Sequence, residues 1–157
     1  MTPADLAGVK AVAAVAFPDH PEDLACFAER QALSPDLCFV LAGEAGVQGY
    51  LVAYPWPRGA PPPPLNSLIG AVSETPGFLY LHDLALAPRA LGGGHARRAI
   101  DLLVETARAK GTKEIALVSV NDSVPFWTAM GFAVRPADPA KLASYGEDAR
   151  YMTRQIF

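Results

Sequence analysis

Three consecutive glycines, Gly92 to Gly94, stand at the entrance of a segment with helical periodicity. The first turn of a helix leaves backbone N–H groups without intrahelical partners, and the helix dipole places partial positive charge there. Because glycine has no Cβ, an anion such as a phosphate can approach these donors closely. Each glycine in helical conformation costs about 0.5–1 kcal/mol relative to alanine. The cluster therefore predicts an anion-binding site, the alternative being a loose loop that happens to precede a helix.

Two titratable residues, His82 and Asp83, lie just before the glycines in the apolar stretch Leu79 to Leu86. This stretch predicts a strand, and Pro88 ends it. Regular strand alternation would place Tyr80, His82 and Leu84 on one face of the sheet and Asp83 on the other.

The sequence on either side of the glycines predicts the helix and strands that hold the glycine loop in place. Ala96, Ile100, Leu103 and Ala107 form one apolar stripe of a helix that runs to about Lys110. Glu114 to Val120 predicts a strand covered on both faces, and a strand, helix and strand in this order predict a right-handed crossover between parallel strands. The other expected elements are helices over 3–16, 22–33, 66–72 and 124–130 and strands over 38–42, 47–54, 132–135 and 150–156, with 136–147 irregular.

The composition limits the class of protein. The chain has 157 residues, 51% of them hydrophobic and 18% charged, which predicts one globular domain. The net charge is −3 and no basic run exists, so a nucleic-acid partner is not expected. No apolar run reaches the ~18 residues that span a bilayer, and the N-terminus lacks the basic segment of a signal peptide. Cys26 and Cys38 form no CxxC pair and have no histidine at ligand spacing, which predicts two free thiols in the cytoplasm and no metal site.

Two loops are open to a functional interpretation. The proline-rich segment 55–65 is expected to be a semi-rigid loop. It would either wall an acceptor pocket together with Trp56 or cover a sheet edge, and a docking motif for another protein is a third, weaker alternative. His20, between Pro18 and Pro21, is expected to be a surface loop residue, with a substrate contact as the less favoured alternative.

Three motifs occur in order along the chain. They are the strand end over 84–88, the Gly-x-Gly-x-Ala entrance over 92–96, and the sequence NDSVPFWTAMGF over 121–132, after the next expected strand. Together they resemble the GNAT superfamily of acetyl-coenzyme A-dependent N-acetyltransferases, from about Cys38 to the end of the chain. The resemblance implies a single GNAT domain over 1–157 with an α/β fold. Its central sheet would be mixed, mostly antiparallel, flanked by helices and splayed at the strand before the glycine loop.

The resemblance also implies where acetyl-CoA binds. The pantetheine arm would pair with the backbone of the splayed strand at Leu84 and Leu86, and the pyrophosphate would lie on the amides of the glycine loop. A dinucleotide-binding loop fits less well, because Arg97 stands where its third glycine would be. The residues implied to bind the cofactor are Leu84, Leu86, Leu91, Gly92, Gly93, Gly94, Ala96, Arg97, Asn121 and Trp127.

Two positions depart from the family pattern. Leu91 stands where an Arg or Gln usually begins the loop, although Arg89 gives a match in a shifted register. Trp127 stands where the family often has a tyrosine that acts as general acid toward the departing thiolate. An indole cannot supply that proton at neutral pH, although its N–H can donate a hydrogen bond. This departure motivates a second hypothesis, a non-catalytic acyl-CoA-binding sensor or scaffold.

The leading hypothesis is transfer of the acetyl group from acetyl-CoA to a primary amine of a small molecule or peptide by direct attack. An aliphatic amine has a pKa near 10, so a base or a water chain must remove its proton at neutral pH. An imidazole suits this task, and His82 is the favoured base, the alternative being a structural histidine. Asp83 is second, as base, as the group that orients the amine or as an arginine partner. Tyr145 is a candidate acid, together with Tyr80 and Tyr151, and a homodimer stays open.

Overall fold

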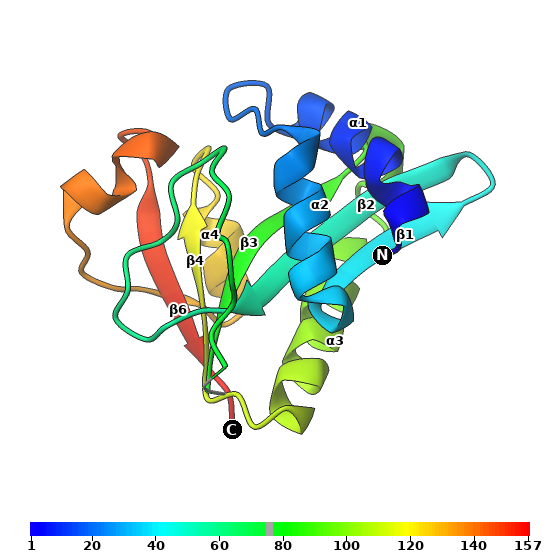
Figure 1. The fold of residues 1–157 in the computed structure, drawn as a ribbon. Coiled ribbons are helices and arrows are strands. Elements are labelled where there is room, and N and C mark those ends of the chain that lie inside the picture. The colour runs from blue at the N-terminus through cyan, green and yellow to red at the C-terminus, as the bar shows by residue number, and fades with distance from the viewer. Residues whose placement is uncertain (75–76) are drawn as a thin grey trace.

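The computed structural model describes residues 1–74 and 77–157. In this part of the chain six strands form one mixed sheet in the order β1-β2-β3-β4-β6-β5, and β3 and β4 are its parallel pair (Figure 1). This is the mixed α/β fold that the sequence predicts. The strands are β1 (Cys38–Gly43), β2 (Gly46–Pro55), β3 (Phe78–Leu86), β4 (Glu114–Ser119), β5 (Ala133–Val134) and β6 (Arg150–Gln155).

Helices cover the two faces of the sheet. Helices α1 (Leu6–Ala16) and α2 (Leu24–Leu33) lie on one face, and α3 (His95–Ala109) lies on the other (Figure 1). The short helix α4 (Val124–Ala129) follows β4. Four 3-10 turns complete the elements: η1 (Pro3–Asp5), η2 (Pro35–Leu37), η3 (Pro88–Ala90) and η4 (Pro139–Tyr145).

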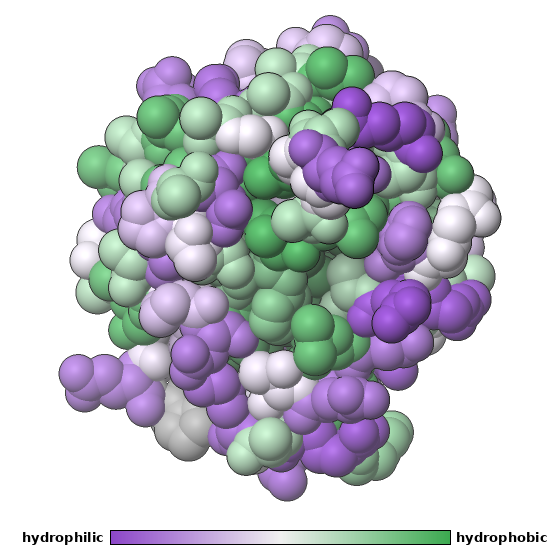
Figure 2. All heavy atoms as spheres, turned by 90° about the vertical axis from the view of Figure 1, so that its right-hand side faces the viewer, coloured by the Kyte–Doolittle hydropathy of each residue, from purple (hydrophilic) through white to green (hydrophobic). Residues whose placement is uncertain are grey.

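Each face of the sheet has its own apolar core. The core under α3 contains Ile100, Leu103 and Ala107, the buried members of the predicted stripe, packed on Leu79 and Leu81 of β3. The core under α1 and α2 is aromatic and joins Phe27 to tyrosines of β2 and β3. Outside these cores, an apolar groove remains between the edge strand β1, β2 and α3, and Figure 2 shows the apolar hollow in the centre of this face.

Two expectations for the connecting segments were wrong. Residues 66–72 form no helix, because Asn66 and Gly70 have positive φ of 53° and 74°, outside the right-handed helical region. The N–H of Gly70 also donates to the carboxylate of Glu29 at 3.1 Å instead of to the carbonyl one turn back. Conversely, the segment expected to be irregular contains η4, whose first turn is capped when Asp138 accepts the N–H of Ala140 at 3.0 Å.

The parallel pairing of β3 with β4 is short. It joins Phe78–Tyr80 to Glu114–Ala116, and beyond these residues the two strands diverge (Figure 1). The sheet is therefore splayed at the strand before the glycine loop, as the resemblance implies. The main-chain edge of β3 that faces β4 has no strand partner from His82 onward in the residues that the structure describes.

A β-bulge in β3 changes which side chains share a face. Val52 of β2 lies opposite Asp83 and Ala53 lies opposite Leu81, so His82 is the extra residue. His82 and Asp83 therefore both face α1 and α2, whereas the neighbouring Leu84 packs in the core under α3. The predicted alternation was right in placing Leu84 opposite to Asp83. It was wrong in placing His82 opposite to Asp83 and on the face of Leu84, because it assumed an unbroken strand.

The α3 core offers a test of what holds the helix behind the glycine loop. We expect Leu103→Ala to lower the free energy of unfolding by about 2–5 kcal/mol, because this fully buried side chain would leave a cavity. Its neighbour Leu102 is 45% exposed, so Leu102→Ala should change stability by about 0.5 kcal/mol or less. Urea denaturation of both variants measures the difference, and equal losses would contradict the assigned helix orientation.

Candidate active site

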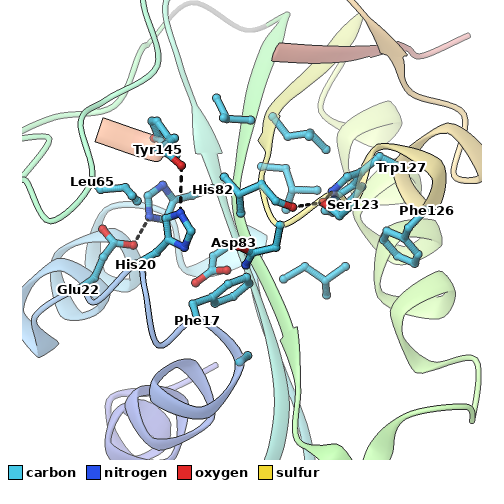
Figure 3. A pocket seen from close by; sticks show the side chains of 17 residues that line it. Phe17, His20, Glu22, Leu65, His82, Asp83, Ser123, Phe126, Trp127 and Tyr145 are labelled. Atoms are coloured by element: carbon cyan, nitrogen blue, oxygen red, sulfur yellow. Dashed lines mark hydrogen bonds and ion pairs between the residues drawn. The ribbon is translucent and has the colours of Figure 1, made fainter. Parts of the chain in front are cut away.

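A cavity of about 300 Å³ lies in the wedge where β3 and β4 part (Figure 3). One wall carries polar side chains from β3, η4 and the loop between α1 and α2, and the other carries Ser123, Phe126 and Trp127 from the start of α4. The three residues predicted to be catalytic, His82, Asp83 and Tyr145, all line this cavity.

His82 is held between two partners. Its Nε2 lies 2.6 Å from Glu22 Oε1, and its Nδ1 lies 3.3 Å from the Tyr54 hydroxyl. Its side chain is only 1% exposed, so the part of His82 that the cavity reaches is mainly its backbone. Both ring nitrogens have partners within the protein, and a base role for His82 requires the Tyr54 contact to open.

Glu22 is the acceptor that orients this imidazole. Burial alone would raise the pKa of Glu22, but the hydrogen bond and charge of His82, together with Arg30, hold that pKa below its ordinary value. The fully buried Arg30 lies 3.9 Å from Glu22 and 5.7 Å from the centre of the Tyr54 ring. Because Glu22 is ionised, it accepts a proton-bearing Nε2, which fixes the orientation of the His82 ring.

Asp83 has a different environment. The hydroxyl of Tyr50 donates a short hydrogen bond to its Oδ2. Burial raises the pKa of Asp83 to about 6, against the opposing effects of His82 and the Tyr50 hydrogen bond. Asp83 is thus a carboxyl group that changes charge close to neutral pH at the wall of the cavity.

Tyr145 comes from η4, an element that the sequence did not predict. Its hydroxyl donates to the carbonyl of Pro63 at 2.5 Å and lies 3.1 Å from the hydroxyl of Tyr80. Burial raises its pKa well above the ordinary value. Because its proton is already donated to Pro63, a role as general acid requires that bond to open.

The proline-rich loop reaches the cavity at its far end. Leu65 lines the cavity and Pro63 anchors Tyr145, in line with the expectation that this loop walls a pocket. Trp56 does not line the cavity. Its indole N–H donates to the carbonyl of Pro61 at 3.0 Å, and its ring packs edge-on against Tyr54.

His20 is the cavity residue that sequence reasoning placed incorrectly. It was expected on the surface, but it lines the cavity, and its Nε2 lies 3.0 Å from the carbonyl of Tyr145. The sequence signal was its position between Pro18 and Pro21, which restrict the backbone of this loop.

The glycine loop leads from β3 into α3. Gly92 and Gly94 have φ of +81° and +73°, and a Cβ on either would meet nothing within 4 Å, so the space at these two residues is open. At Gly93 the imidazole of His95 lies close, 2.7 Å from the position that a Cβ would take. In the part of the chain that the structure describes, no side-chain hydrogen bond caps the start of α3 at Gly94. Leu91 is 66% exposed beside it, and Arg97 is exposed on the first turn of α3. Free N–H groups under open space are what an anion site at a helix start requires.

The opposite wall of the wedge is built around Ser123. Its hydroxyl donates to the carbonyl of Val120 at 2.6 Å and accepts the indole N–H of Trp127 at 3.1 Å. The Trp127 N–H is therefore used inside the protein, and its ring packs edge-on against Phe132. Asn121, at the end of β4, has a positive φ of +54° and also lines the cavity.

Over residues 1–74 and 77–157, no group of three or more His, Cys, Asp or Glu side chains is arranged to hold a metal ion. Both cysteines are free and buried. No helix in this same part of the chain is long and apolar enough to cross a membrane.

Comparison with known proteins decides the family. Residues 9–132, most of the chain, match the acetyltransferase (GNAT) family. The chain belongs to the GNAT family of acetyltransferases. It is therefore an acyltransferase, with its cavity at the splay of the GNAT sheet. No curated protein matches the sequence at a significant level.

Solved structures of GNAT proteins share this fold over nearly the whole chain. Ard1 from Thermoplasma volcanium has a TM-score of 0.77 at 16% identity, over 100% of this chain and 95% of its own. The GNAT-like decarboxylase GphF, solved with isobutyryl-CoA, has a TM-score of 0.79 at 17% identity, over 100% and 97%. The ribosomal-protein-S18-alanine N-acetyltransferase from Escherichia coli has a TM-score of 0.70 at 16% identity, over 99% and 90%.

The raised pKa of Asp83 predicts a pH-dependent cost to stability. Between pH 3.8, the ordinary pKa, and about 6, the unfolded chain loses this proton while the native chain keeps it, so stability falls as pH rises. Asp83→Asn removes the free-energy cost of ionising a buried carboxyl group, and the amide oxygen of the asparagine can still accept the hydrogen bond from the Tyr50 hydroxyl. We expect the variant to be about 1–3 kcal/mol more stable than the wild type at pH 7.5, with the gain vanishing near pH 4.

Urea denaturation at pH 4, 6 and 7.5 measures this difference. Asp19→Asn, at an exposed position, is the control and should change stability by about 0.5 kcal/mol or less at each pH. A gain for Asp83→Asn that is the same at all three pH values would contradict a carboxyl group that titrates in this window.

Proposed function

We propose that the chain transfers the acetyl group of acetyl-CoA to a primary amine of a small molecule or peptide by direct attack. The observation that carries the proposal is the wedge between β3 and β4, which runs from the open glycine loop to a cavity with acidic and imidazole side chains. A thioester held in the wedge would meet at this cavity the groups that can bind an ammonium ion and take its proton.

The cofactor would follow β3. Its pyrophosphate would lie on the amides of Gly92, Gly93, Gly94 and Ala96, with Arg97 and the exposed Leu91 beside it. Its pantetheine arm would pair with the free edge of β3 near Leu84 and Leu86, whose other edge already pairs with β2. Asn121 and Trp127 would form the opposite wall. Support comes from GphF, a relative in fold that was solved with isobutyryl-CoA.

The catalytic assignments follow from the geometry. Asp83 would hold the ammonium group of the acceptor, because a buried carboxylate gains most from a cationic partner. His82 would order Glu22 and the cavity wall, or act as base once the Tyr54 contact opens. Tyr145 would shape the cavity or supply the proton to the thiolate. A backbone N–H near Leu86 would stabilise the oxyanion of the tetrahedral intermediate, an effect of a few kcal/mol in such sites.

The acceptor is a small molecule or the terminus of a peptide. One relative in fold is named for a protein substrate, the ribosomal-protein-S18-alanine N-acetyltransferase, and another for a small molecule, the nourseothricin acetyltransferase. A thiol-release assay with acetyl-CoA and a panel of 2-phenylethylamine, putrescine and a peptide with free N-terminal alanine tests the proposal. Thiol release with at least one amine is expected. Tight acetyl-CoA binding without thiol release for any amine would favour the non-catalytic acyl-CoA-binding module instead.

Leu91 allows a matched test of the phosphate site. Its backbone is extended and its side chain exposed, so Leu91→Asp and Leu91→Asn should both fold normally. A carboxylate here would repel the pyrophosphate by about 1 kcal/mol or more, so we expect Leu91→Asp to weaken acetyl-CoA binding roughly fivefold to tenfold relative to Leu91→Asn.

Calorimetric titration measures both affinities. S-acetyl-pantetheine, which lacks the pyrophosphate, is the control ligand and should bind the two variants equally. Equal affinities of the two variants for acetyl-CoA would contradict a pyrophosphate at this loop.

A further inference from the structure

His20 has one ring nitrogen without a partner. Its Nε2 lies 3.0 Å from the carbonyl oxygen of Tyr145, and a carbonyl oxygen can only accept, so Nε2 must carry a proton. In the neutral imidazole the lone pair is then on Nδ1. This Nδ1 is buried and has no hydrogen-bond partner in the described residues. A buried acceptor left unpaired costs about 1–3 kcal/mol, which is a reason to look for a ligand that pairs with it.

The place of His20 indicates what that ligand is. A second, smaller cavity of about 130 Å³ lies beside the first, toward α1. Phe17, His20, Glu22 and Asp83 line both cavities, so His20 and Asp83 belong to the wall that the two cavities share. Figure 3 shows His20 joined to Tyr145 by a dashed line, on the same side of the cavity as Glu22, His82 and Asp83. A basic nitrogen and a carboxyl group in the wall of one cavity can together bind an ammonium group. Because Nδ1 is buried, a neighbouring side chain of the lining has to move before a ligand contacts it.

His82 and His20 differ in what they have free. Both ring nitrogens of His82 contact protein groups, Glu22 and Tyr54. In His20 only Nε2 has such a contact among the described residues, so Nδ1 can accept a proton. The same carbonyl that anchors His20 also fixes which nitrogen is basic. Holding the base in one tautomer and orientation is what general base catalysis requires.

We propose that His20 Nδ1 is the general base that takes the proton from the acceptor ammonium, while Asp83 holds that ammonium group. This assignment rests on the proposed function. His20 Nδ1 accepts one proton from the ammonium, and the neutral nitrogen attacks the thioester carbonyl. The N–C bond forms, the C–S bond breaks, and the second proton of the nitrogen goes to the thiolate. His20 then returns its proton to solvent, so that the products are the amide and the free thiol.

The charged and titratable groups around His20 come from every element packed on it. Lys10 belongs to α1, Glu22 to the loop before α2, His82 and Asp83 to β3, and Tyr145 to η4. Lys10 is already bound, since its ammonium donates to the carbonyl of Glu22. A pH profile therefore reports on this whole group, and the test needs readouts specific to the His20 ring.

His20→Gln is the informative variant. The glutamine amide can still donate to the Tyr145 carbonyl, but it has no basic nitrogen. For the amine of the panel that the wild type turns over best, we expect kcat at pH 7 to fall at least about 100-fold, with the KM for acetyl-CoA changed less than about threefold. The loss should shrink as pH rises, because more acceptor is then neutral without a base.

A fluorinated analogue of that amine separates a base from a structural role. Two or three fluorine atoms on the carbon β to the nitrogen lower the amine pKa to about 7 or below, so the acceptor is largely neutral at pH 7 and needs no base. His20→Gln should then lose less than about tenfold in kcat. Asp19→Asn, in the same loop and exposed, is the control for loop perturbation and should keep wild-type activity with both acceptors.

The ring state of His20 is measured independently by ¹⁵N NMR of the wild-type chain. We expect the tautomer with the proton on Nε2, and the opposite tautomer would overturn the inference. Equal kcat losses for the ordinary and the fluorinated amine, or no loss at all, would also overturn it while leaving the acetyltransferase proposal intact. Absence of thiol release by the wild type with any amine would instead refute the proposed function, and this inference with it.

Discussion

The site depends on how briefly β3 and β4 pair. Three residues of each strand are joined in parallel, and beyond Tyr80 the strands separate because each has a different partner to follow. β3 stays with β2 as far as Leu86, and β4 stays with β6 along its whole length. The sheet thus opens without losing its pairing elsewhere, and the backbone edge inside the opening is kept free for a ligand.

Where the sheet opens, polar side chains lie in a low-dielectric interior. Their desolvation is offset because they pair with one another. Glu22, Arg30 and His82 form a buried group in which the carboxylate of Glu22 lies 3.9 Å from Arg30 and 2.6 Å from His82. Removing one member of such a group leaves the others unpaired, which is more costly than never burying them. The loop between α1 and α2 therefore cannot be treated as a variable connection, since Glu22 belongs to it.

The glycine loop and the titratable residues of β3 could be recognised in the sequence. Which distant residues lie beside them in the folded chain could not. Gly92 to Gly94 identified the helix entrance because a run of glycines has few local explanations, and His82 was found by its position in an apolar strand. His20 and Tyr145 were not recognised as neighbours, because 125 residues separate them and only the folded loop brings them together. The same limit applies to the contact between Tyr145 and the proline-rich loop, which no periodicity or motif encodes.

The bulge at His82 means that the site is specified by the length of β3 as well as by its composition. A substitution changes which side chain stands at one position and leaves the others where they are. An insertion or deletion of a single residue within β3 would instead exchange the two faces for part of the strand. Homologues that keep this cavity can therefore differ widely in sequence, but their central strands should show little variation in residue count.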